Sequence, residues 1–390
     1  MQLNTLFYLA LILFSGLVFG RAVKLAKLPN VTGYLVAGLL IGPFVLRLVP
    51  ADTVKGLEVV SEMALAFIAF SIGSEFKLTY LKKVGPMPVV IAVFEGLTAS
   101  VAVALALVMF GFDTELALLL GAIASATAPA ATIMVVKQYR AKGPVTETLL
   151  SVVAIDDAVA LIAFGFAVAI VNMMQNPGET SLILAILKPV GEILGSLLLG
   201  FLLGLMFKIP LRYFKKDSNR LIITCAFIFL GSSLASMLGL SPLLLCMAMS
   251  ATLVNVSSDA NSILKLADTV TPPIFLMFFV VSGMELDITV LPQVGLIGII
   301  YIIFRVVGKI AGASLGAAIM KAPEAVRKYI GFSLVPQAGV AIGLSLLAAQ
   351  LVPDYARIIR AVILSATLIY ELTGPAITKA SLDRAGELNA

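Results

Sequence analysis

The sequence predicts an all-α integral membrane protein with about thirteen transmembrane helices. Of its 390 residues, 60% are hydrophobic and 13% are charged, whereas soluble domains average about 25% charged residues. The mean hydropathy is +1.08. The apolar windows have the length of helices that cross a bilayer, and they lack the short alternating pattern of an outer-membrane barrel.

The apolar segments follow one another as a single membrane unit over residues 1–390. The first is followed by basic residues and not by a small-residue cleavage site, so we interpret it as a membrane helix and not as a signal peptide. The predicted spans are 5–26, 30–47, 57–76, 86–110, 114–137, 147–174, 181–210, 219–238, 241–256, 269–285, 291–319, 326–350 and 356–378.

The loop charges predict how these spans are oriented. If the N-terminus lies outside, the cytoplasmic connections and the C-terminal tail contain most of the 27 Lys and Arg residues. This asymmetry satisfies the positive-inside rule and predicts a cytoplasmic C-terminus. The net charge of +5 belongs to these loops and gives no indication of a nucleic-acid partner.

Two adjacent acids, Asp156 and Asp157, stand in the middle of the sixth span. The surrounding run LLSVVAIDDAVALIAFGFAVAIV, residues 149–171, has no other charge. Each charge near the centre of a bilayer costs about 2.5–3.5 kcal/mol even on lenient insertion scales. So costly a pair is expected to bind an ion or a proton.

The two halves of the chain repeat each other. The run LAFIAFSIGSEF at 65–76 corresponds to FLMFFVVSGMEL at 275–286, which places Gly73 and Gly283 at matching positions 210 residues apart. The first copy enters the membrane from outside and the second from inside, so the repeats are inverted. Inverted repeats with matching interrupted helices are typical of secondary transporters. Chance similarity between apolar segments is the alternative.

Each repeat also has a proline in the middle of an apolar span, in SATAPAAT at 125–132 and SLVPQAGV at 333–340. A proline there frees a backbone carbonyl, and irregular backbone at membrane depth is tolerated only inside protein or along a cavity. We expect two interrupted helices that cross, with ordinary proline kinks as the alternative. The residues expected at the crossing are Ala126, Thr127, Ala128, Pro129, Thr132, Pro336 and Gln337.

Two basic residues, Arg305 and Lys309, lie deep in the span at 291–319. Their spacing of four puts both on one helix face, which is expected to point into the protein. Asp156 and Asp157 are the natural counter-charges, although adjacent helical residues point about 100° apart and only one aspartate can face a given cation squarely. The alternative is that both basic side chains reach back to the membrane surface.

Single acids elsewhere in the spans are not expected to bind ions. Glu95, Glu192 and Glu371 each interrupt an apolar span alone, and each could line a pathway or pair with a backbone donor. Cys225 and Cys246 lie in predicted spans without metal or disulfide spacing, and we interpret them as buried thiols.

Several of these motifs together resemble the monovalent cation:proton antiporters, and most closely the bacterial NapA-like and germination-antiporter-like Na+/H+ exchangers. The resemblance covers about residues 5–380, and the double aspartate is its most specific mark. The motifs that carry it are GYLVAGLLIGPF at 33–44, FSIGSEF at 70–76, ATAPAAT at 126–132, VVAIDDAVALIAF at 152–164, the Lys-x-x-Gly run from Lys309, and SLVPQAGVAIGLS at 333–345.

The resemblance implies the Na+/H+ antiporter fold, with inverted repeats and two crossed broken helices. It implies a core domain over about 57–174 and 269–380, and a dimerisation or scaffold domain over about 5–47 and 181–256. It further implies a homodimer among the lipids of a bacterial cytoplasmic membrane, in which the core moves like an elevator.

By position, Asp157 resembles the ion-binding carboxylate of the family and Asp156 the acid that pairs with a basic residue. The spacing Lys-x-x-Gly-x-x-x-Gly favours Lys309 as that residue, while Arg305, one turn earlier, stays open. Thr127 resembles a cation-coordinating group. The resemblance therefore implies Na+, or else Li+ or K+, bound by the two aspartates and Thr127.

The chain departs from the family pattern in two ways. Where many relatives read Pro-Arg-Gly-Glu, it reads PQAG at 336–339, so that an acid is missing. It also has no histidine, so any response to pH must come from carboxylates or lysine.

The expected function is exchange of protons for a monovalent cation, Na+ or Li+ before K+, by alternating access. A proton and a cation exclude each other from one carboxylate, so exchange needs no enzyme chemistry, no ATP and no cofactor. The resemblance implies electrogenic exchange, with two protons per cation, and a role in pH homeostasis. The alternatives are a K+/H+ exchanger or K+ efflux protein of the same superfamily, a cation channel and an organic-anion symporter.

Overall fold

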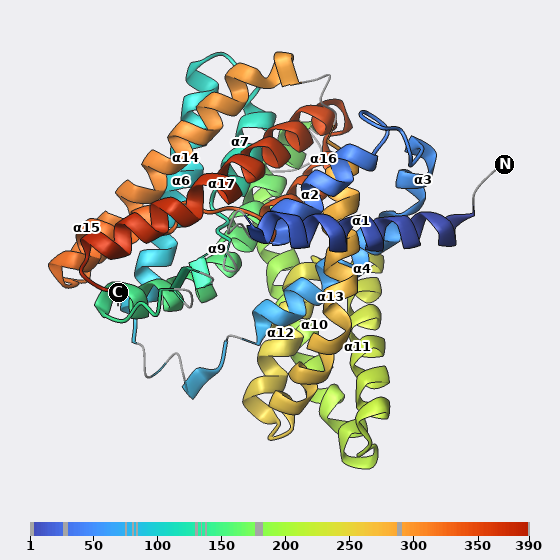
Figure 1. Cartoon of the computed structure of the whole chain (residues 1–390). Helices are drawn as coiled ribbons and strands as arrows, with labels where there is room; N and C mark the ends of the chain where they lie inside the picture. Colours follow the sequence, from blue (N-terminus) through green and yellow to red (C-terminus); the bar gives the residue numbers. More distant parts are fainter. Residues whose placement is uncertain are drawn as a thin grey trace. The chain divides into compact units, whose positions relative to one another are not determined.

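The structure is a computed structural model, and it describes residues 4–25, 30–74, 76–79, 82, 85–128, 132–133, 135–136, 139–175, 182–286 and 291–388. All regular secondary structure in these residues is helical (Figure 1). The chain divides into two compact units, of which the first is Met1–Glu58, Pro86–Phe164 and Leu276–Ala390 and the second is Val59–Gly85 and Gly165–Phe275.

Most helices belong to one unit. The first unit contains α1 (Thr5–Leu25), α2 (Asn30–Ile41), α3 (Ala51–Gly56), α6 (Met87–Met109), α7 (Thr114–Ala124), α14 (Leu291–Ile319), α15 (Glu324–Ser333), α16 (Gly339–Leu351), the 3-10 helix η1 (Pro353–Tyr355) and α17 (Ala356–Arg384). The second contains α4 (Glu58–Gly73), α10 (Leu182–Tyr213), α11 (Asp217–Met237) and α12 (Pro242–Val256). Both contribute to α9 (Pro144–Gln175) and α13 (Ala260–Met284).

The helices have the apolar character of membrane spans. Within the described residues, 8 helices are long and apolar enough to cross a bilayer, and four shorter apolar helices accompany them. The all-helical membrane class is therefore confirmed, whereas the count of thirteen crossings stays a prediction. The predicted core and scaffold domains differ in whether they move during transport. The division into two compact units does not test such movement, so the predicted domains also stay a prediction.

The order of helices repeats along the chain. Helices α1, α2, α7 and α9 begin at residues 5, 30, 114 and 144, and α11, α12, α15 and α17 begin roughly 210 residues later, at 217, 242, 324 and 356. Helix α10 lies between the two sets without a counterpart. If the first set crosses the membrane an even number of times, the unmatched crossing of α10 makes the second set start on the opposite side, as inverted repeats require.

The glycines of the predicted repeat make matching contacts. A side-chain carbon added at Gly73 would collide with the carbonyl oxygen of Met247 in α12, and one added at Gly283 would collide with that of Leu35 in α2. Each glycine thus lets its helix touch the backbone of a neighbour within its own unit. Small residues serve this purpose in membrane helix packing, because they allow two backbones to approach closely.

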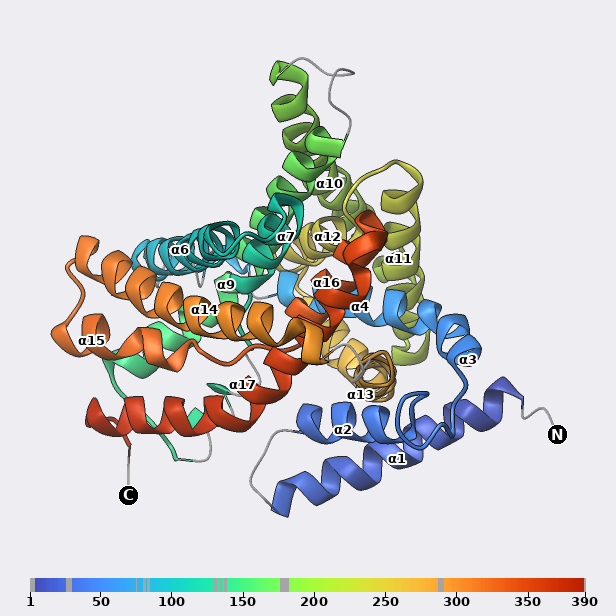
Figure 2. The ribbon, with the colours of Figure 1, turned by 90° about the horizontal axis from the view of Figure 1, so that it is seen from above.

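Helices α6 and α14 pack side by side in the first unit (Figure 2). Gly308, Gly312 and Gly316 recur at every fourth position of α14 and face the backbone of α6. A side-chain carbon added at Gly312 would lie only 2.7 Å from the Cα atom of Glu95. This close approach brings α6 within reach of Lys309, which is on the same helix as the glycines.

Two helices of the first unit are interrupted as predicted. Helix α7 ends at Ala124 and residues 126–128 are not helical, while 334–338 separate α15 from α16. The two interruptions meet, because the backbone N–H of Ala128 donates to the carbonyl of Pro336 at 2.9 Å. Pro129, which was also predicted at this crossing, lies outside the described residues.

The start of α9 is held by the end of the chain. The Glu387 carboxylate accepts hydrogen bonds from the backbone N–H groups of Val145 and Thr146, each at 2.7 Å, and from the Thr146 hydroxyl at 2.8 Å. These N–H groups have no partner within the helix, and a carboxylate there also interacts favourably with the helix dipole. The helix that contains both predicted aspartates is thereby fixed at its N-terminus.

Candidate functional site

Helix α9 buries both predicted aspartates inside the first unit. Asp156 is 0% exposed and Asp157 is 3% exposed. Burying a carboxylate costs several kcal/mol unless it is paired or neutralised. The surroundings of each aspartate therefore determine whether it is charged.

Lys309 of α14 lies between two carboxylates. Its Nζ atom is 3.1 Å from Oδ2 of Asp156 and 2.7 Å from Oε2 of Glu95, and all three side chains are 0% exposed. It also donates to the Thr127 hydroxyl at 2.6 Å and to the carbonyl of Ser125. Lys309 thus connects α6 and α9 with the non-helical segment after α7.

Arg305 lies one turn earlier on α14 and makes different contacts. Its guanidinium donates to the carbonyls of Ala124 at 3.0 Å, Ala126 at 2.7 Å and Val335 at 2.6 Å, and it lies 4.6 Å above the Tyr370 ring. Carbonyls at helix C-termini lack partners within the helix and form the negative end of its dipole. Arg305 therefore neutralises the interrupted ends of α7 and α15.

The two basic residues that the sequence left open are thus distinguished by position. Among the described ion pairs, Asp156 pairs with Lys309 and not with Arg305, which forms no ion pair with either aspartate. The alternative that both side chains reach the membrane surface is wrong, because each is 0% exposed. Both side chains donate to carbonyls next to the end of α7, but of the two only Lys309 also contacts acids among the described residues.

Gln337, in the second interrupted segment, forms a hydrogen bond to the end of α7. Its Nε2 atom donates to the carbonyl of Ile123 at 3.0 Å, and the Tyr301 hydroxyl donates to its Oε1 atom at 3.1 Å. The side chain is fully buried. Together with Arg305, Gln337 satisfies backbone carbonyls that the interruption leaves without helical partners.

Asp157 is the acid of this site that has no cation beside it. In the described part of the chain, no basic side chain lies within ion-pair distance of Asp157, and its buried Oδ1 atom has no hydrogen-bond partner. Thr127, predicted to coordinate the same cation, is 2% exposed, and its hydroxyl contacts Lys309.

Glu95 belongs to this cluster, which the sequence did not predict. A single acid in an apolar span has no motif that names its partner, and its role depends on which face of α6 meets α14. The available signal was the glycine repeat on α14, since Gly312 faces the backbone of Glu95. The depth of Glu95 in its span and the small-residue face of the helix opposite would together have indicated that Glu95 has a buried partner.

The charges of the cluster indicate the kind of ligand it can take. Glu95 and Asp156 share the ammonium group of Lys309, and Asp157 adds a third acid, so the cluster has an excess of negative charge unless protons or cations neutralise it. Within the described residues, no three His, Cys, Asp or Glu side chains converge as ligands of a divalent metal would. Carboxylate and hydroxyl oxygens suit a hard cation, so the geometry fits a proton or a small monovalent cation.

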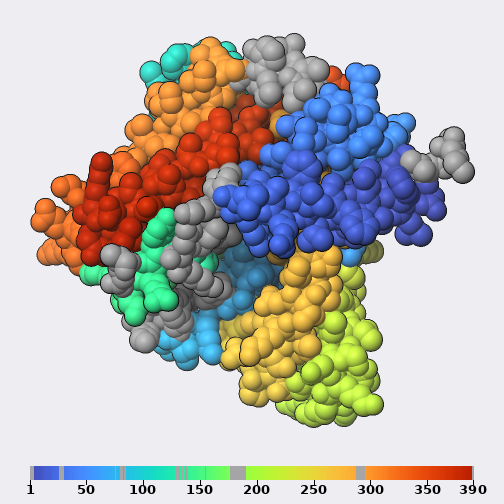
Figure 3. All heavy atoms as spheres, in the orientation of Figure 1, coloured from blue at the N-terminus to red at the C-terminus, as the bar shows by residue number. Residues whose placement is uncertain are grey.

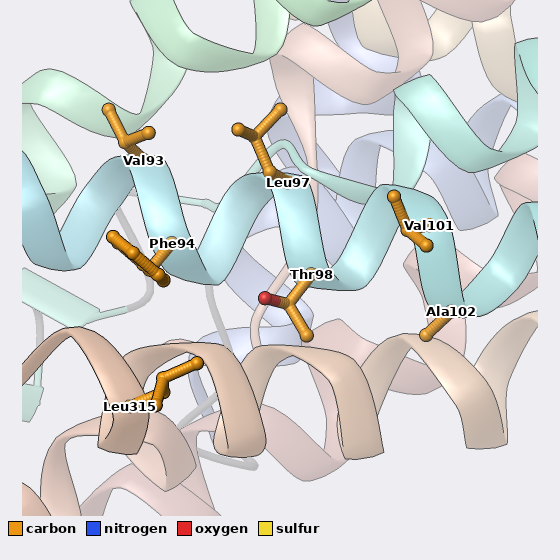
Figure 4. Close-up of a pocket in the computed structure, with 7 residues that line it drawn as sticks. All are labelled: Val93, Phe94, Leu97, Thr98, Val101, Ala102 and Leu315. Carbon is orange, nitrogen blue, oxygen red and sulfur yellow. The ribbon is translucent and has the colours of Figure 1, made fainter.

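A groove lined by residues of α6 and α14 has a different character from this cluster. It has a volume of about 400 Å3, and Leu315 of α14 points toward α6 across it (Figure 4). Among the described residues that line it, Thr98 is the only polar one. Without a charged group, this groove provides no ligand for an ion.

The chain is similar to known membrane proteins over most of its length. The sequence model of the family described as "Sodium/hydrogen exchanger, transmembrane" matches residues 9–379. The chain is 25% identical to the "High-affinity Na(+)/H(+) antiporter NhaS3" of Synechocystis sp., over 87% of this chain and 81% of that protein. It is 24% identical to the "Ammonium/H(+) antiporter subunit AmhT" of Alkalihalophilus pseudofirmus, over 90% of this chain and 88% of that protein.

A shorter match and a solved structure complete the comparison. A stretch of 61 residues is 41% identical to "K(+) efflux antiporter 5" of Arabidopsis thaliana, which is 16% of this chain and 10% of that protein. The structure of the sodium proton antiporter MjNhaP1 from Methanocaldococcus jannaschii superposes with a TM-score of 0.81, over 98% of this chain and 99% of that chain. At 17% identity, this similarity concerns the fold.

Proposed function

The chain belongs to the sodium/hydrogen exchanger family, and from that premise we propose that it exchanges Na+ for protons at Asp157. The family exchanges a monovalent cation for protons across a membrane. The choice of Na+ and the assignment of the site are our proposals. The observation that supports the site best is that Asp157 is buried beside the Lys309 cluster without a basic partner among the described residues.

Competition at Asp157 gives the coupling between the two ions. An ionised carboxylate in a low-dielectric interior requires a positive charge close by. A bound proton removes the charge, and a bound cation compensates it, so the two ligands exclude each other. If the site opens to one side of the membrane at a time, this exclusion converts a gradient of one ion into movement of the other.

Lys309 and its two acids suggest how a second proton takes part. One ammonium group cannot compensate two buried carboxylates, so we propose that Glu95 and Asp156 share one proton while both contact Lys309. Loss of that proton together with the one at Asp157 would release two protons for each Na+ bound. Exchange would then move net charge and respond to the membrane potential.

The choice of Na+ rests on the relatives of the chain. NhaS3, which matches over most of its length, is named for Na+, whereas the K+ efflux antiporter matches over 61 residues only. AmhT, which also matches over most of its length, is named for ammonium. We therefore retain exchange of K+ or ammonium as the second candidate.

Several wider features are proposed together with this function. The distribution of Lys and Arg supports a bacterial cytoplasmic membrane with the N-terminus outside and the C-terminus in the cytoplasm. We also propose a homodimer, with a scaffold over about 5–47 and 181–256 and a mobile core over about 57–174 and 269–380. This arrangement rests on the family resemblance.

Exchange in proteoliposomes tests the proposal directly. With a pH gradient across the vesicle and a fluorescent pH dye, we expect Na+ and Li+ to dissipate the gradient. We expect D157N to reduce this flux to the level of protein-free vesicles, because an amide neither ionises nor exchanges a proton. E62Q, at an exposed acid of α4, is the control and should exchange normally.

The outcomes separate the candidates. Flux with K+ or ammonium but not with Na+ would favour the second candidate. Full Na+-dependent proton flux in D157N would show that the ion site lies elsewhere. Cation movement that continues in D157N without proton movement would indicate a channel.

A further inference from the structure

A second buried acid, Glu371, lies away from the Lys309 cluster. It is 1% exposed in α17, which packs against α2 in the first unit (Figure 3). Its carboxyl faces the Thr32 hydroxyl of α2, which is itself 2% exposed. The buried atoms Oε2 of Glu371 and Oγ1 of Thr32 have no hydrogen bond of good geometry in the described structure.

A third polar atom lies on the same face of α17. Thr367 precedes Glu371 by one helical turn, so their side chains share a face of the helix. It is 0% exposed, and its Oγ1 atom also has no hydrogen-bond partner among the described residues. An acid and two hydroxyls thus gather in apolar surroundings without the bonds that would satisfy them.

The helices packed against α17 bring no cation to this acid. The described residues of α2 and α16 include no charged side chain. From α14, Arg305 lies against the neighbouring Tyr370 and donates to backbone carbonyls, and Lys309 is paired with Glu95 and Asp156.

The charged groups of α17 itself, of α15 and of η1 lie elsewhere along the helix. On α17, Arg360 pairs with Glu285 at 3.2 Å, and Lys379 lies over the Tyr139 ring. The charged residues of α15 are near Tyr329, whose carbonyl accepts from Ser381 at 2.7 Å, almost three turns beyond Glu371. Asp354 and Tyr355 of η1 precede α17, about four turns before Glu371. Tyr34, the titratable residue of α2, faces Asn30.

An ionised carboxylate buried in this way would have no compensating charge. The cost of removing such an ion from water is several kcal/mol, whereas a protonated carboxyl is neutral and can donate one hydrogen bond to a hydroxyl. We propose that Glu371 is a second proton-binding site of this chain, separate from Asp157, and that its proton maintains the contact between α2 and α17.

The position of α17 connects this proton to the ion site. Tyr370 lies beneath the guanidinium of Arg305, and a side-chain carbon added at Gly374 would lie 2.8 Å from Cγ of Pro336. The helix that contains Glu371 thus packs against the crossing of the interrupted helices. A proton that binds only when α2 and α17 are in contact shifts the protein toward that arrangement. Loss of the proton as the pH rises favours an arrangement in which Glu371 reaches water, and it gives a chain without histidine a response to pH.

Infrared spectroscopy of the full-length protein in lipid tests the proton itself. The C=O stretching band of a protonated carboxylic acid is resolved from the bands of carboxylates and amides. We expect the difference between wild type and E371Q at neutral pH to contain one such band, and the difference between wild type and E62Q to contain none. A wild-type spectrum that differs from E371Q only in carboxylate bands would overturn the proposal.

Exchange assays test the consequence of that proton. We expect E371Q, which is permanently neutral, to continue exchange but to lose one step from the pH dependence of its rate. T32V keeps the carboxyl and removes only the facing hydroxyl, so it should retain the band at a shifted frequency. An unaltered pH dependence in E371Q would overturn the regulatory role, and an unshifted band in T32V would overturn the contact. If E371Q fails to fold, T32V and T367V test the proposal through a shifted band and a displaced step in the pH dependence of the rate.

Different results would refute this inference and the proposed function. D157N should lose exchange but keep the Glu371 band. Exchange that persists in D157N refutes the assignment of the ion site without altering the infrared result for Glu371.

Discussion

A single ammonium group, that of Lys309, lies between two buried carboxylates, and this makes it the most consequential charge of the cluster. Its Nζ atom lies 3.1 Å from Asp156 and 2.7 Å from Glu95, with no exposure of any of the three side chains. Removing one partner of a buried ion pair costs about 3–5 kcal/mol, because the other charge stays buried without compensation. Loss of either acid leaves the other beside Lys309 and should cost less.

We therefore predict that K309A lowers the free energy of unfolding at neutral pH by about 3–5 kcal/mol. E95Q should lower it by much less, since Lys309 then retains Asp156. As the pH falls, protonation removes the charges that K309A leaves uncompensated, so the difference from wild type should narrow. Thermal unfolding in detergent between neutral and acidic pH measures this. A deficit in K309A that is equal at all pH values would indicate lost packing and not lost charge compensation.

At the scale of elements, the close contact of α6 with α14 determines which residues meet. A side-chain carbon added at Gly312 would lie 2.7 Å from the Cα atom of Glu95 and would force the two backbones apart. We predict that G312A destabilises the protein and reduces exchange, because separation of the helices lengthens the Lys309–Glu95 contact. The matched control on the same helix is G298A, since an added carbon at Gly298 meets nothing within 4 Å.

The two substitutions should have opposite effects on stability. Replacing glycine by alanine in a helix interior, without a clash, stabilises by roughly 0.5–1 kcal/mol. G298A should therefore be neutral or slightly stabilising and should exchange like wild type, whereas G312A should unfold at a lower temperature. Equal behaviour of the two variants would show that the approach of α14 to α6 does not govern the cluster.

The helical elements could be predicted from sequence because local features define them. Apolar length gives the spans, and the prolines in 125–132 and 333–340 mark the interruptions. The partners within the site could not be predicted in the same way. Arg305 and Lys309 share a helix face and both donate to carbonyls next to the end of α7, so the packing of α6 and α9 around α14 determines which of them meets the acids. Glu95 lacked a local signal altogether, since its role depends on how α14 packs against α6.

At the scale of the whole molecule, the proposed mechanism requires part of the chain to move relative to the rest. The proposed boundary between scaffold and core passes between α2 and its neighbours in the first unit. An added carbon at Gly42, just after α2, would lie 3.1 Å from Cβ of Met284, which belongs to the proposed core. Within the core, an added carbon at Gly308 would lie 3.1 Å from Cβ of Ala102.

These two equal distances allow a matched cross-linking experiment. Cβ atoms joined by a disulfide are about 3.5–4.5 Å apart, so either pair of cysteines can bond after a small adjustment. The background should have Cys225 and Cys246 replaced by serine, because both are free thiols. We predict that oxidation of G42C/M284C stops exchange and that reduction restores it, because the bond ties the scaffold to the core. Because a side chain at Gly308 also meets the Cα atom of Ala99 at 2.6 Å, the reference for each pair is its own reduced form. Oxidation of A102C/G308C should not change exchange relative to the reduced form, since both residues would move together. Full exchange by oxidised G42C/M284C, with the cross-link verified by mass spectrometry, would place the moving boundary elsewhere in the chain.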